Sequence, residues 1–240
     1  MQKQLSVPSY GGNTRPIGAV HMHVIPRNPH TAVPGKELTF KEILEYGFPH
    51  GSLHPEVAAW RRGNLKNLWR GLYRVLTARC VNISHIYGQL SLVVVRRNGE
   101  WLDYGLASMR VVTTTGVNYI VDAFQNTTEV ENLKFHGFGT GTNAEAVGDT
   151  TLQTELTTQY NPDSTRPTGS TTEGASANIY RTVGTLSPDA GGTIAITEHG
   201  IFSATSAGTL LDRSVFSAVN IVASADSLQA TYDLTVSSGG

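Results

Sequence analysis

The sequence has 240 residues, of which 39% are hydrophobic and 15% are charged, with a formal net charge of −1 at pH 7, and this length suits one large or two small domains. The single cysteine, Cys80, excludes an intrachain disulfide and a multi-cysteine metal site, and we expect a buried, inert thiol. No run of 18 apolar residues occurs and residues 1–16 lack an apolar signal segment, so we expect a protein made in the cytoplasm with no membrane partner.

The small net charge hides two halves of opposite sign. Residues 1–110 contain 14 Lys or Arg and 6 Asp or Glu, a net charge of +8, whereas residues 111–240 contain 4 and 13, a net charge of −9. This segregation indicates two modules that face different partners. Two differently composed domains that attract each other are the alternative interpretation.

Residues 1–35 are predicted to form an extended arm, because the segment contains five prolines, each of which lacks a backbone N–H and restricts the preceding residue. Within the arm, "AVHMHVI" alternates and could add one strand to a partner's sheet. His21 and His23 share one face of that strand, a spacing that suits two metal ligands. No Cys, Asp or Glu lies close by in sequence to complete a tetrahedral set. We therefore expect partner-binding or packing roles for both histidines, and no metal or other cofactor.

Residues 36–110 are interpreted as a small basic α+β region that anchors the chain. In "TFKEILEYG", Thr39 and Glu42 have the spacing of a capping box and Gly47 ends the predicted helix. A second helix is predicted from Pro55 to about residue 79. Its expected apolar face consists of Leu65, Leu68, Trp69, Leu72, Val75 and Leu76.

A basic stripe accompanies this second helix, since four cationic residues recur every four positions. A solvated helix face is the simplest interpretation, and contact with an acidic protein surface or with packaged nucleic acid is the functional alternative. Nucleic acid is the less favoured partner, because no helix-turn-helix or RNA-binding signature accompanies the charge. The stripe consists of Arg62, Lys66, Arg70 and Arg74.

From residue 80 onward the hydrophobic period changes to two, which predicts antiparallel strands. Asn98-Gly99 predicts a hairpin between two of them. A short Thr-capped helix is expected over 114–126, with Val117, Ile120, Val121 and Phe124 on one side. The predicted strands are 80–87, 90–96, 101–108, 132–138, 176–187, 192–204, 209–216, 218–222 and 227–236.

This pattern predicts a mainly β fold with a few helices. We expect an acidic antiparallel β-sandwich over residues 111–240, preceded by the arm at 1–35 and the α+β region at 36–110. Residues 157–175 are polar throughout and are predicted to form a long exposed loop.

The segment "NLKFHGFGTGTNAEAVGDT" carries glycines at 137, 139 and 141, which raises the question of a phosphate-binding loop. The spacing is neither G-x-G-x-x-G nor that of a P-loop, no lysine follows, and the surroundings are acidic. We predict a tight turn followed by a short helix over 150–156. Glu198 and His199 are expected on opposite faces of a strand with a structural role. No catalytic motif occurs elsewhere, so we do not expect an enzyme.

The strand-turn-strand segment "ITEHGIFSATSAGTLLDRSVFSAV" has the form T-x-x-G-I-F-x-A, a glycine turn, and then L-L-x-R-S-x-F. On these residues, residues 105–240 resemble a β-sandwich module of tailed-bacteriophage virion proteins. The resemblance implies a structural component such as a tail-fibre or decoration protein. The positions that carry it are Thr197, Gly200, Ile201, Phe202, Ala204, Leu210, Leu211, Arg213, Ser214 and Phe216.

We therefore expect a non-enzymatic virion protein that is assembled in the host cytoplasm. The favoured function is a capsid decoration, or cement, protein that binds the major capsid protein through its N-terminal half. Self-association as a homo-oligomer, such as a trimer or hexamer, would reinforce that attachment. A tail or neck component (fibre, adaptor or collar protein) is the alternative, and a carbohydrate-binding receptor module is a further one.

Overall fold

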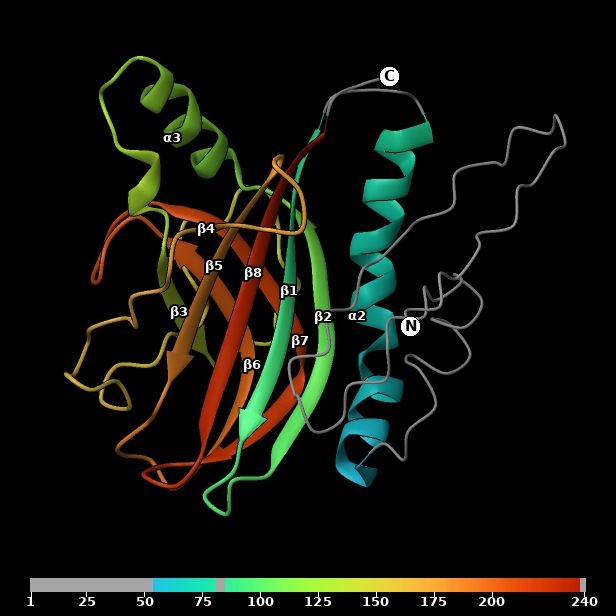
Figure 1. Cartoon of the computed structure of the whole chain (residues 1–240), viewed down its shortest axis with the longest axis vertical. Coiled ribbons are helices and arrows are strands. Elements are labelled where there is room, and N and C mark those ends of the chain that lie inside the picture. Colours follow the sequence, from blue (N-terminus) through green and yellow to red (C-terminus); the bar gives the residue numbers. More distant parts are fainter. Residues whose placement is uncertain (1–53, 81–84, 238–240) are drawn as a thin grey trace, which may run out of the picture. The chain divides into compact units, whose positions relative to one another are not determined.

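The computed structural model describes residues 54–80 and 85–237, which form a mainly β structure with antiparallel sheets and two α-helices (Figure 1). These residues belong to one compact unit, Ser52–Gly240. The predicted arm at 1–35, the helix expected at 39–47 and residues 81–84 of the strand expected at 80–87 lie outside the described residues. Cys80, where that strand was expected to begin, is instead the last residue of the helix Pro55–Cys80. The predicted fold class is confirmed for the part of the chain that is described.

One sheet has five strands in the order β2-β1-β8-β5-β4, with every neighbouring pair antiparallel. Its strands are β1 (His85–Val95), β2 (Trp101–Val111), β4 (Thr172–Glu173), β5 (Ile179–Leu186) and β8 (Ser227–Ser237). Because β1 and β2 belong to the same sheet as β5 and β8, the boundary expected at residue 110 does not separate two folds.

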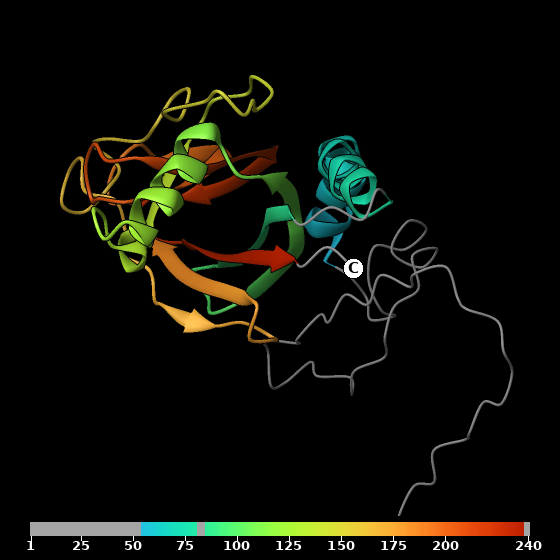
Figure 2. The same cartoon turned by 90° about the horizontal axis from the view of Figure 1, so that it is seen from above.

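The second sheet has three antiparallel strands in the order β3-β6-β7, and it forms the other layer of a sandwich (Figures 1 and 2). Its strands are β3 (Phe135–Gly139), β6 (Thr193–Phe202) and β7 (Leu210–Val222). Alternate residues of both sheets face inward, as the period of two predicts. The core that they form includes Leu90, Leu92, Leu186, Ile196, Val219, Ile221, Leu228 and Ala230.

Two strands are longer than the hydrophobic pattern indicated. β1 joins the predicted strand that ends at Tyr87 to the one that begins at Leu90, because Gly88 between them pairs with Leu234. β7 likewise runs through Ser217, which we expected to separate two strands. In both places the backbone pairing continues although the side-chain alternation is interrupted.

The predicted hairpin between β1 and β2 is confirmed. The Gly99 amide donates to the Arg96 carbonyl oxygen at 2.9 Å, and the Arg96 amide donates to Glu100 at 2.9 Å. Gly99 has a φ of +81°, whereas Asn98 is not among the residues with positive φ. The turn therefore places only its glycine in the left-handed region, as in a three-residue hairpin loop.

Helix α2 (Pro55–Cys80) lies beside the sandwich and covers edge strands of both sheets, β2 and β7 (Figure 2). The buried Asn64 amide donates to the Ala107 carbonyl oxygen at 2.7 Å and accepts from the Ser217 amide at 2.8 Å. The Trp60 indole donates to the Ser217 carbonyl oxygen at 2.6 Å. The helix thus satisfies edge groups that would otherwise be unpaired.

The buried face of α2 differs from the predicted one. Val57, Trp60 and Asn64 are buried in the N-terminal half of the helix, and Leu72 and Val75 are buried in its C-terminal half. Trp69, which we placed on the apolar face, is 40% exposed. Leu68, Leu72, Val75 and Leu76 of the predicted face do pack together, against Tyr87 and Met109. The prediction was wrong at Trp69 and missed Asn64, because the helix meets the strand edges partly through polar groups.

Helix α3 (Thr114–Phe124) begins at the predicted threonine cap. The Thr113 hydroxyl oxygen accepts a hydrogen bond from the Gly116 amide at 3.0 Å and donates to the Leu210 carbonyl oxygen at 2.7 Å. Tyr119 donates to the Glu129 carbonyl oxygen at 3.0 Å, just before the 3₁₀ turn η1 (Val130–Asn132). The first contact fixes the start of α3 to β7, and the second ties its middle to the loop that follows it. The helix lies beyond one end of the strands (Figure 1).

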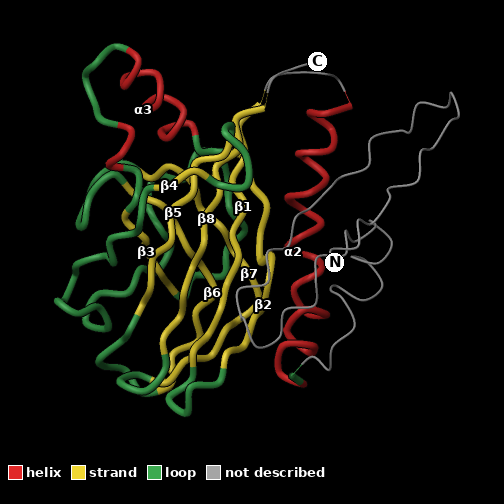
Figure 3. Tube along the Cα trace, in the orientation of Figure 1, coloured by secondary structure: helices red, strands yellow, loops and turns green. Residues whose placement is uncertain are grey.

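The connection between β3 and β5 contains long loops (Figure 3) that pack more closely than predicted. Residues 150–156 do not form the expected helix. Leu152 and Leu156 are buried, and the Leu156 amide donates to the Phe138 carbonyl oxygen beside β3. The loop predicted to be exposed over 157–175 buries Tyr160 and Arg166, so that prediction was wrong at these positions.

The two glycines of α2 provide a test of how the helix packs on β2. A Cβ at Gly71 would overlap the Met109 carbonyl oxygen, whereas a Cβ at Gly63 would lie 3.6 Å from Ser217 Oγ, an ordinary contact. We expect Gly71→Ala to lower the free energy of unfolding by about 2–3 kcal/mol through overpacking. The matched Gly63→Ala should leave it unchanged or raise it by up to about 1 kcal/mol, because alanine favours helix. Urea unfolding measures both, and equal effects of the two changes would contradict the described docking of α2.

Candidate interaction surfaces

The glycine segment does cradle an anion, and the anion is the carboxylate of Glu198. This side chain is fully buried and accepts hydrogen bonds from the amides of Gly141, Gln153 and Thr154 at 2.7–3.0 Å. A Cβ at Gly139 or Gly141 would lie 2.5 Å from Glu198 Oε1. The prediction of a tight turn is therefore wrong at Gly137 and Gly139, which lie on strand β3. Gly139 and Gly141 leave room for the buried carboxylate of Glu198.

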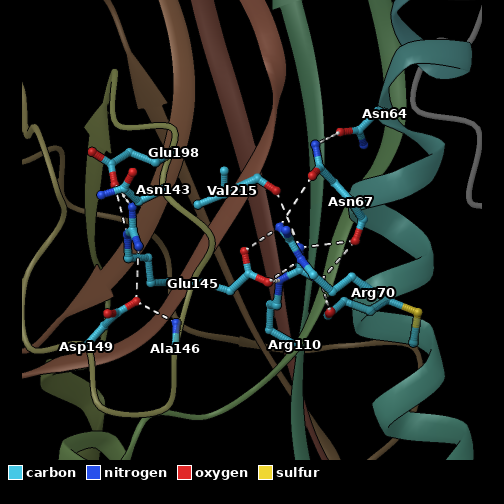
Figure 4. A network of polar contacts seen from close by, with 12 residues as sticks. Asn64, Asn67, Arg70, Arg110, Asn143, Glu145, Ala146, Asp149, Glu198 and Val215 are labelled. Carbon is cyan, nitrogen blue, oxygen red and sulfur yellow. Dashed lines mark hydrogen bonds and ion pairs between the residues drawn. The ribbon is translucent and has the colours of Figure 1, made fainter.

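Arg213 neutralises the Glu198 carboxylate. Its Nε and one terminal nitrogen lie 2.9 and 2.8 Å from Glu198 Oε2, and the other terminal nitrogen lies 3.1 Å from Asp149 Oδ2. Asp149 also accepts from the Ala146 amide at 2.8 Å (Figure 4). A buried carboxylate with an ion-pair partner and three amide donors satisfies the requirement for burying a charge.

A second buried carboxylate, that of Glu145, ties the same loop to α2 and β2 (Figure 4). Arg70 donates to both of its oxygens at 3.1 and 2.9 Å, and Arg110 Nε lies 2.9 Å from Oε1. Arg110 is itself buried and also donates to the Met109 carbonyl oxygen at 2.7 Å. Glu145 is a key residue that sequence reasoning missed; the acidic character of its loop was noted only as an argument against phosphate.

Two histidines form a buried hydrogen-bonded chain between the layers. His136 Nδ1 lies 3.0 Å from His199 Nε2, and His136 Nε2 lies 3.0 Å from the Thr182 hydroxyl. Burial lowers the pKa of His136 to about 3 and, together with the neighbouring His136, holds the pKa of His199 well below 6.5. Both rings are therefore neutral near pH 7, in agreement with the structural role expected for His199.

Asp212 is a third buried carboxyl group, on β7. It accepts a hydrogen bond from the Tyr232 hydroxyl at 2.9 Å, and it lies against Gly88 of β1. Burial raises its pKa from 3.8 to about 7, and the hydrogen bond from Tyr232 and the charge of Arg110 oppose this increase. Asp212 is therefore largely protonated below neutral pH, as a carboxyl group in an apolar layer is expected to be.

These polar clusters hold loops against the sheets, and nothing in their geometry identifies a reaction. Within residues 54–80 and 85–237, no group of three His, Cys, Asp or Glu side chains is arranged to hold a metal ion. Among the same residues, no helix has the length and apolar character needed to cross a bilayer. The predicted pair His21 and His23 lies outside the described residues.

The predicted basic stripe on α2 is only partly available to a partner. Arg62 and Lys66 are exposed, but Arg70 is paired with Glu145, and the side chain of Arg74 lies outside the described part of the chain. Residues four apart drift by about 40° per step around a helix, which turns Arg70 away from Arg62 and toward the loop.

A different set of residues shares the outward side of α2. Their spacing of four, three and four keeps them within about 60° of one another on the helix. Trp69 is 40% and Tyr73 is 70% exposed, so two cationic and two aromatic side chains lie along one line. We call this set the α2 stripe: Arg62, Lys66, Trp69 and Tyr73.

Helix α3 presents a second exposed surface of opposite character. Val117 and Val121 are 42% and 47% exposed, and Phe124 is 87% exposed. Tyr119 and Ile120 pack against the core, so the apolar arc of the helix is wider than its contact with the sandwich. We call Val117, Val121 and Phe124 the α3 stripe; we predicted that these residues share one side of the helix but not that they are exposed.

No protein-family model matches this chain, and no curated protein matches it in sequence. Functional inference therefore depends on the surfaces and buried groups described above. The α2 stripe combines cationic and aromatic groups, and the α3 stripe is purely apolar. Both are types of surface that proteins use for contacts with other macromolecules.

Removing the charge of Glu198 tests whether the buried carboxylate stabilises the fold. In Glu198→Gln, Arg213 loses its closest anion and the three amides face a neutral group. We expect the free energy of unfolding to fall by about 3–5 kcal/mol. The control Glu173→Gln changes an exposed side chain and should shift it by less than about 0.5 kcal/mol. Chemical denaturation compares the two, and a Glu198→Gln protein as stable as the control would contradict a structural role for this carboxylate.

The raised pKa of Asp212 predicts how the free energy of unfolding changes with pH. The folded state keeps its proton up to about pH 7, whereas the unfolded chain loses it near 3.8, so stabilisation by this group declines as pH rises between these values. Relative to Asp212→Asn, the wild-type free energy of unfolding should therefore fall by about 1.4 kcal/mol per pH unit in this window. Other titrating groups are common to both proteins and cancel in the difference. Denaturation curves from pH 4 to 8 measure it, and parallel pH profiles would show that the pKa is not raised.

Proposed function

We propose that this chain is a non-enzymatic structural protein of a tailed-bacteriophage particle, and that it works as a decoration, or cement, protein on the capsid. The observation that carries the proposal is the α2 stripe, which exposes Arg62, Lys66, Trp69 and Tyr73 on one side of the helix. Helix α2 begins at Pro55 and follows residues 1–53 in sequence, which contain 5 Lys or Arg and 3 Asp or Glu. In this proposal the α2 stripe binds an acidic shell surface, and residues 1–53 add positive charge to the same half of the chain.

Charge distribution supports this direction of attachment. Residues 111–240 carry a net charge of −9, whereas residues 1–110 carry +8. An acidic shell attracts the end of the molecule that contains α2 and repels the remainder of the sandwich, which orients the protein during encounter. The aromatic side chains of Trp69 and Tyr73 then supply apolar contact area, and aromatic groups beside arginine are typical of interface centres.

The residues that carry the resemblance to phage virion proteins have structural roles in the fold. This supports a shared structural module more than a shared reaction. They form the β6–β7 hairpin, whose turn has Gly208 at a φ of +76°. Arg213 of this motif clamps Glu198, and Phe216 lies in the core. A virion part needs this kind of rigid scaffold, because its task is to remain in place under load.

The cement mechanism is mechanical. A protein that bridges neighbouring shell subunits adds contacts that must break together when internal pressure expands the shell. Attachment through a charged anchor is strongest at low ionic strength and weakens as salt rises. The carbohydrate-binding alternative is less supported, because Tyr160, within the loop at 157–175, is 1% exposed and offers no platform to a sugar.

Charge reversal on the α2 stripe tests this proposal. We expect Arg62→Glu and Lys66→Glu each to reduce incorporation of the protein into purified particles about tenfold or more, since each places a like charge against an acidic surface. Arg97→Glu makes the same change in the basic half of the chain but outside the α2 stripe, at an exposed position in the β1–β2 turn, and should reduce incorporation much less. Quantitative gel analysis of gradient-purified particles gives both the incorporation and the copy number.

The copy number in the same experiment separates the two virion roles. Copies comparable in number to the capsid subunits would support decoration, and a number that matches a tail or neck ring would support the alternative. A chain absent from particles, or one incorporated equally well after charge reversal at Arg62 and Lys66, would refute the proposed anchor.

A further inference from the structure

A chain of hydrogen bonds crosses the interior from one sheet to the other. It runs from His199 on β6 through His136 on β3 to Thr182 on β5, with 3.0 Å at each step. His136 pairs with Ile201, two residues beyond His199, so the two rings are diagonal neighbours on one face of the three-stranded sheet. His136 and Thr182 are 0% exposed, and His199 is 1% exposed. The chain therefore links the two layers of the sandwich inside the core.

The backbone of the opposite layer holds the His136 ring in place. A Cβ at Gly184 of β5, or at Gly169 of the loop before it, would overlap this ring. Both glycines therefore let the main chain pack directly against the imidazole. His136 cannot turn away from His199 unless the layers themselves separate.

No described group supplies a counter-charge to the two rings. Glu198, the neighbour of one ring on β6, faces the opposite side and is paired with Arg213 of β7. The titratable groups on the inner side are Asp212 of β7, which accepts from the Tyr232 hydroxyl of β8, and Tyr180 of β5, which donates to a backbone carbonyl oxygen. Burial raises the pKa of Asp212 to about 7, so this group is itself neutral at the acidic pH at which a histidine binds a proton.

The contact between the two rings limits how many protons the pair can hold. In the hydrogen bond between His136 Nδ1 and His199 Nε2, one nitrogen donates and the other accepts. One added proton fits, for example on His136 Nε2, which then donates to the Thr182 hydroxyl oxygen. A second added proton would place N–H groups on both facing nitrogens, in two positive rings whose centroids are 5.1 Å apart. In the unfolded chain both histidines bind a proton below about pH 6.5, so the folded pair holds at least one proton fewer.

We infer that this chain of two histidines and a threonine is an acid-sensitive latch, which ties the sheets together while both rings are neutral and admits the second proton only when the rings part. Burial lowers the pKa of both rings, in agreement with this proton count. Because the folded state binds fewer protons than the unfolded state, the stabilisation is complete above about pH 6.5 and is lost as the pH falls below it. The inference concerns the fold itself and holds independently of the proposed virion role.

The proton count also sets the size of the effect. Excluding one proton raises the unfolding equilibrium constant about tenfold for each pH unit of acidification, and excluding both raises it about a hundredfold. Asp212 acts in the opposite direction, because its raised pKa makes the folded state bind a proton more tightly than the unfolded chain does. A comparison with a variant that lacks both histidines and keeps Asp212 isolates the latch, since the other titrating groups cancel.

Urea unfolding of the full-length chain between about pH 4.5 and 7.5 tests the latch. The variant combines His136→Gln with His199→Gln, which keeps hydrogen-bonding groups at both positions without a titrating ring. The ratio of the wild-type unfolding equilibrium constant to that of the variant should be constant above about pH 7 and should rise about tenfold to a hundredfold per pH unit below about pH 6. A lower overall stability of the variant changes the value of this ratio but not its dependence on pH.

The matched control, His54→Gln, removes a histidine whose side chain is 41% exposed. Its unfolding equilibrium constant relative to the wild type should change by less than about threefold over the same pH range. Identical pH profiles of the wild type and the double variant would overturn the inference, and so would a pH dependence as large in His54→Gln.

A second measurement uses the wild type alone and decides the question if the double variant does not fold. In NMR spectra recorded as the pH is lowered, the ring resonances of two histidines should stay constant until the protein unfolds. A folded wild-type protein in which every histidine ring titrates near about pH 6.5 would show that the buried pair accepts both protons, and the latch would be refuted.

Discussion

The structure depends most on how helix α2 closes the open edges of two sheets. β2 and β7 each end a sheet, and an uncovered edge presents backbone groups that pair with any other strand. The single amide of Asn64 satisfies one group on each edge, with a donor at 2.7 Å to Ala107 and an acceptor at 2.8 Å from Ser217. This contact fixes the rotation of α2 about its axis, and therefore decides which of its side chains face outward.

This rotation of α2 divides its basic residues into two groups. Arg70 faces the loop and is used to bind Glu145, together with Arg110. Arg62 and Lys66 face away and remain exposed beside Trp69 and Tyr73. The same helix thus closes the sandwich through one side, clamps a loop through another and presents a cationic-aromatic surface on the third. Because Arg70 is paired with Glu145 within the molecule, the exposed cationic-aromatic surface is restricted to the α2 stripe.

The strands were largely predictable from the sequence, because each buries one face and so alternates, and the Gly99 turn and the Thr113 cap follow from local chemistry. Interactions between distant residues were not predictable. Glu198 and the amide of Gly141 are 57 residues apart, and Arg70 and Glu145 are 75 apart. Periodicity also misled where a polar group mediates packing: Asn64 is buried and Trp69 is half-exposed, the reverse of their usual tendencies. The exposure of Phe124 could not be foreseen, because an apolar arc wider than its contact looks the same in sequence as a fully buried one.

The α2 stripe is cationic and aromatic, whereas the α3 stripe is apolar, and the two types of surface suit different partners. An apolar surface such as that of Val121 offers contact area without charge, so it suits a partner whose own surface is apolar. Attachment to a different, acidic surface has the opposite requirement and needs positive groups such as Arg62 and Lys66. Salt also acts differently on the two contacts, because it screens the charged one and leaves apolar burial nearly unaffected or strengthened. Separation of the charged and apolar contacts onto α2 and α3 therefore lets each be optimised without weakening the other.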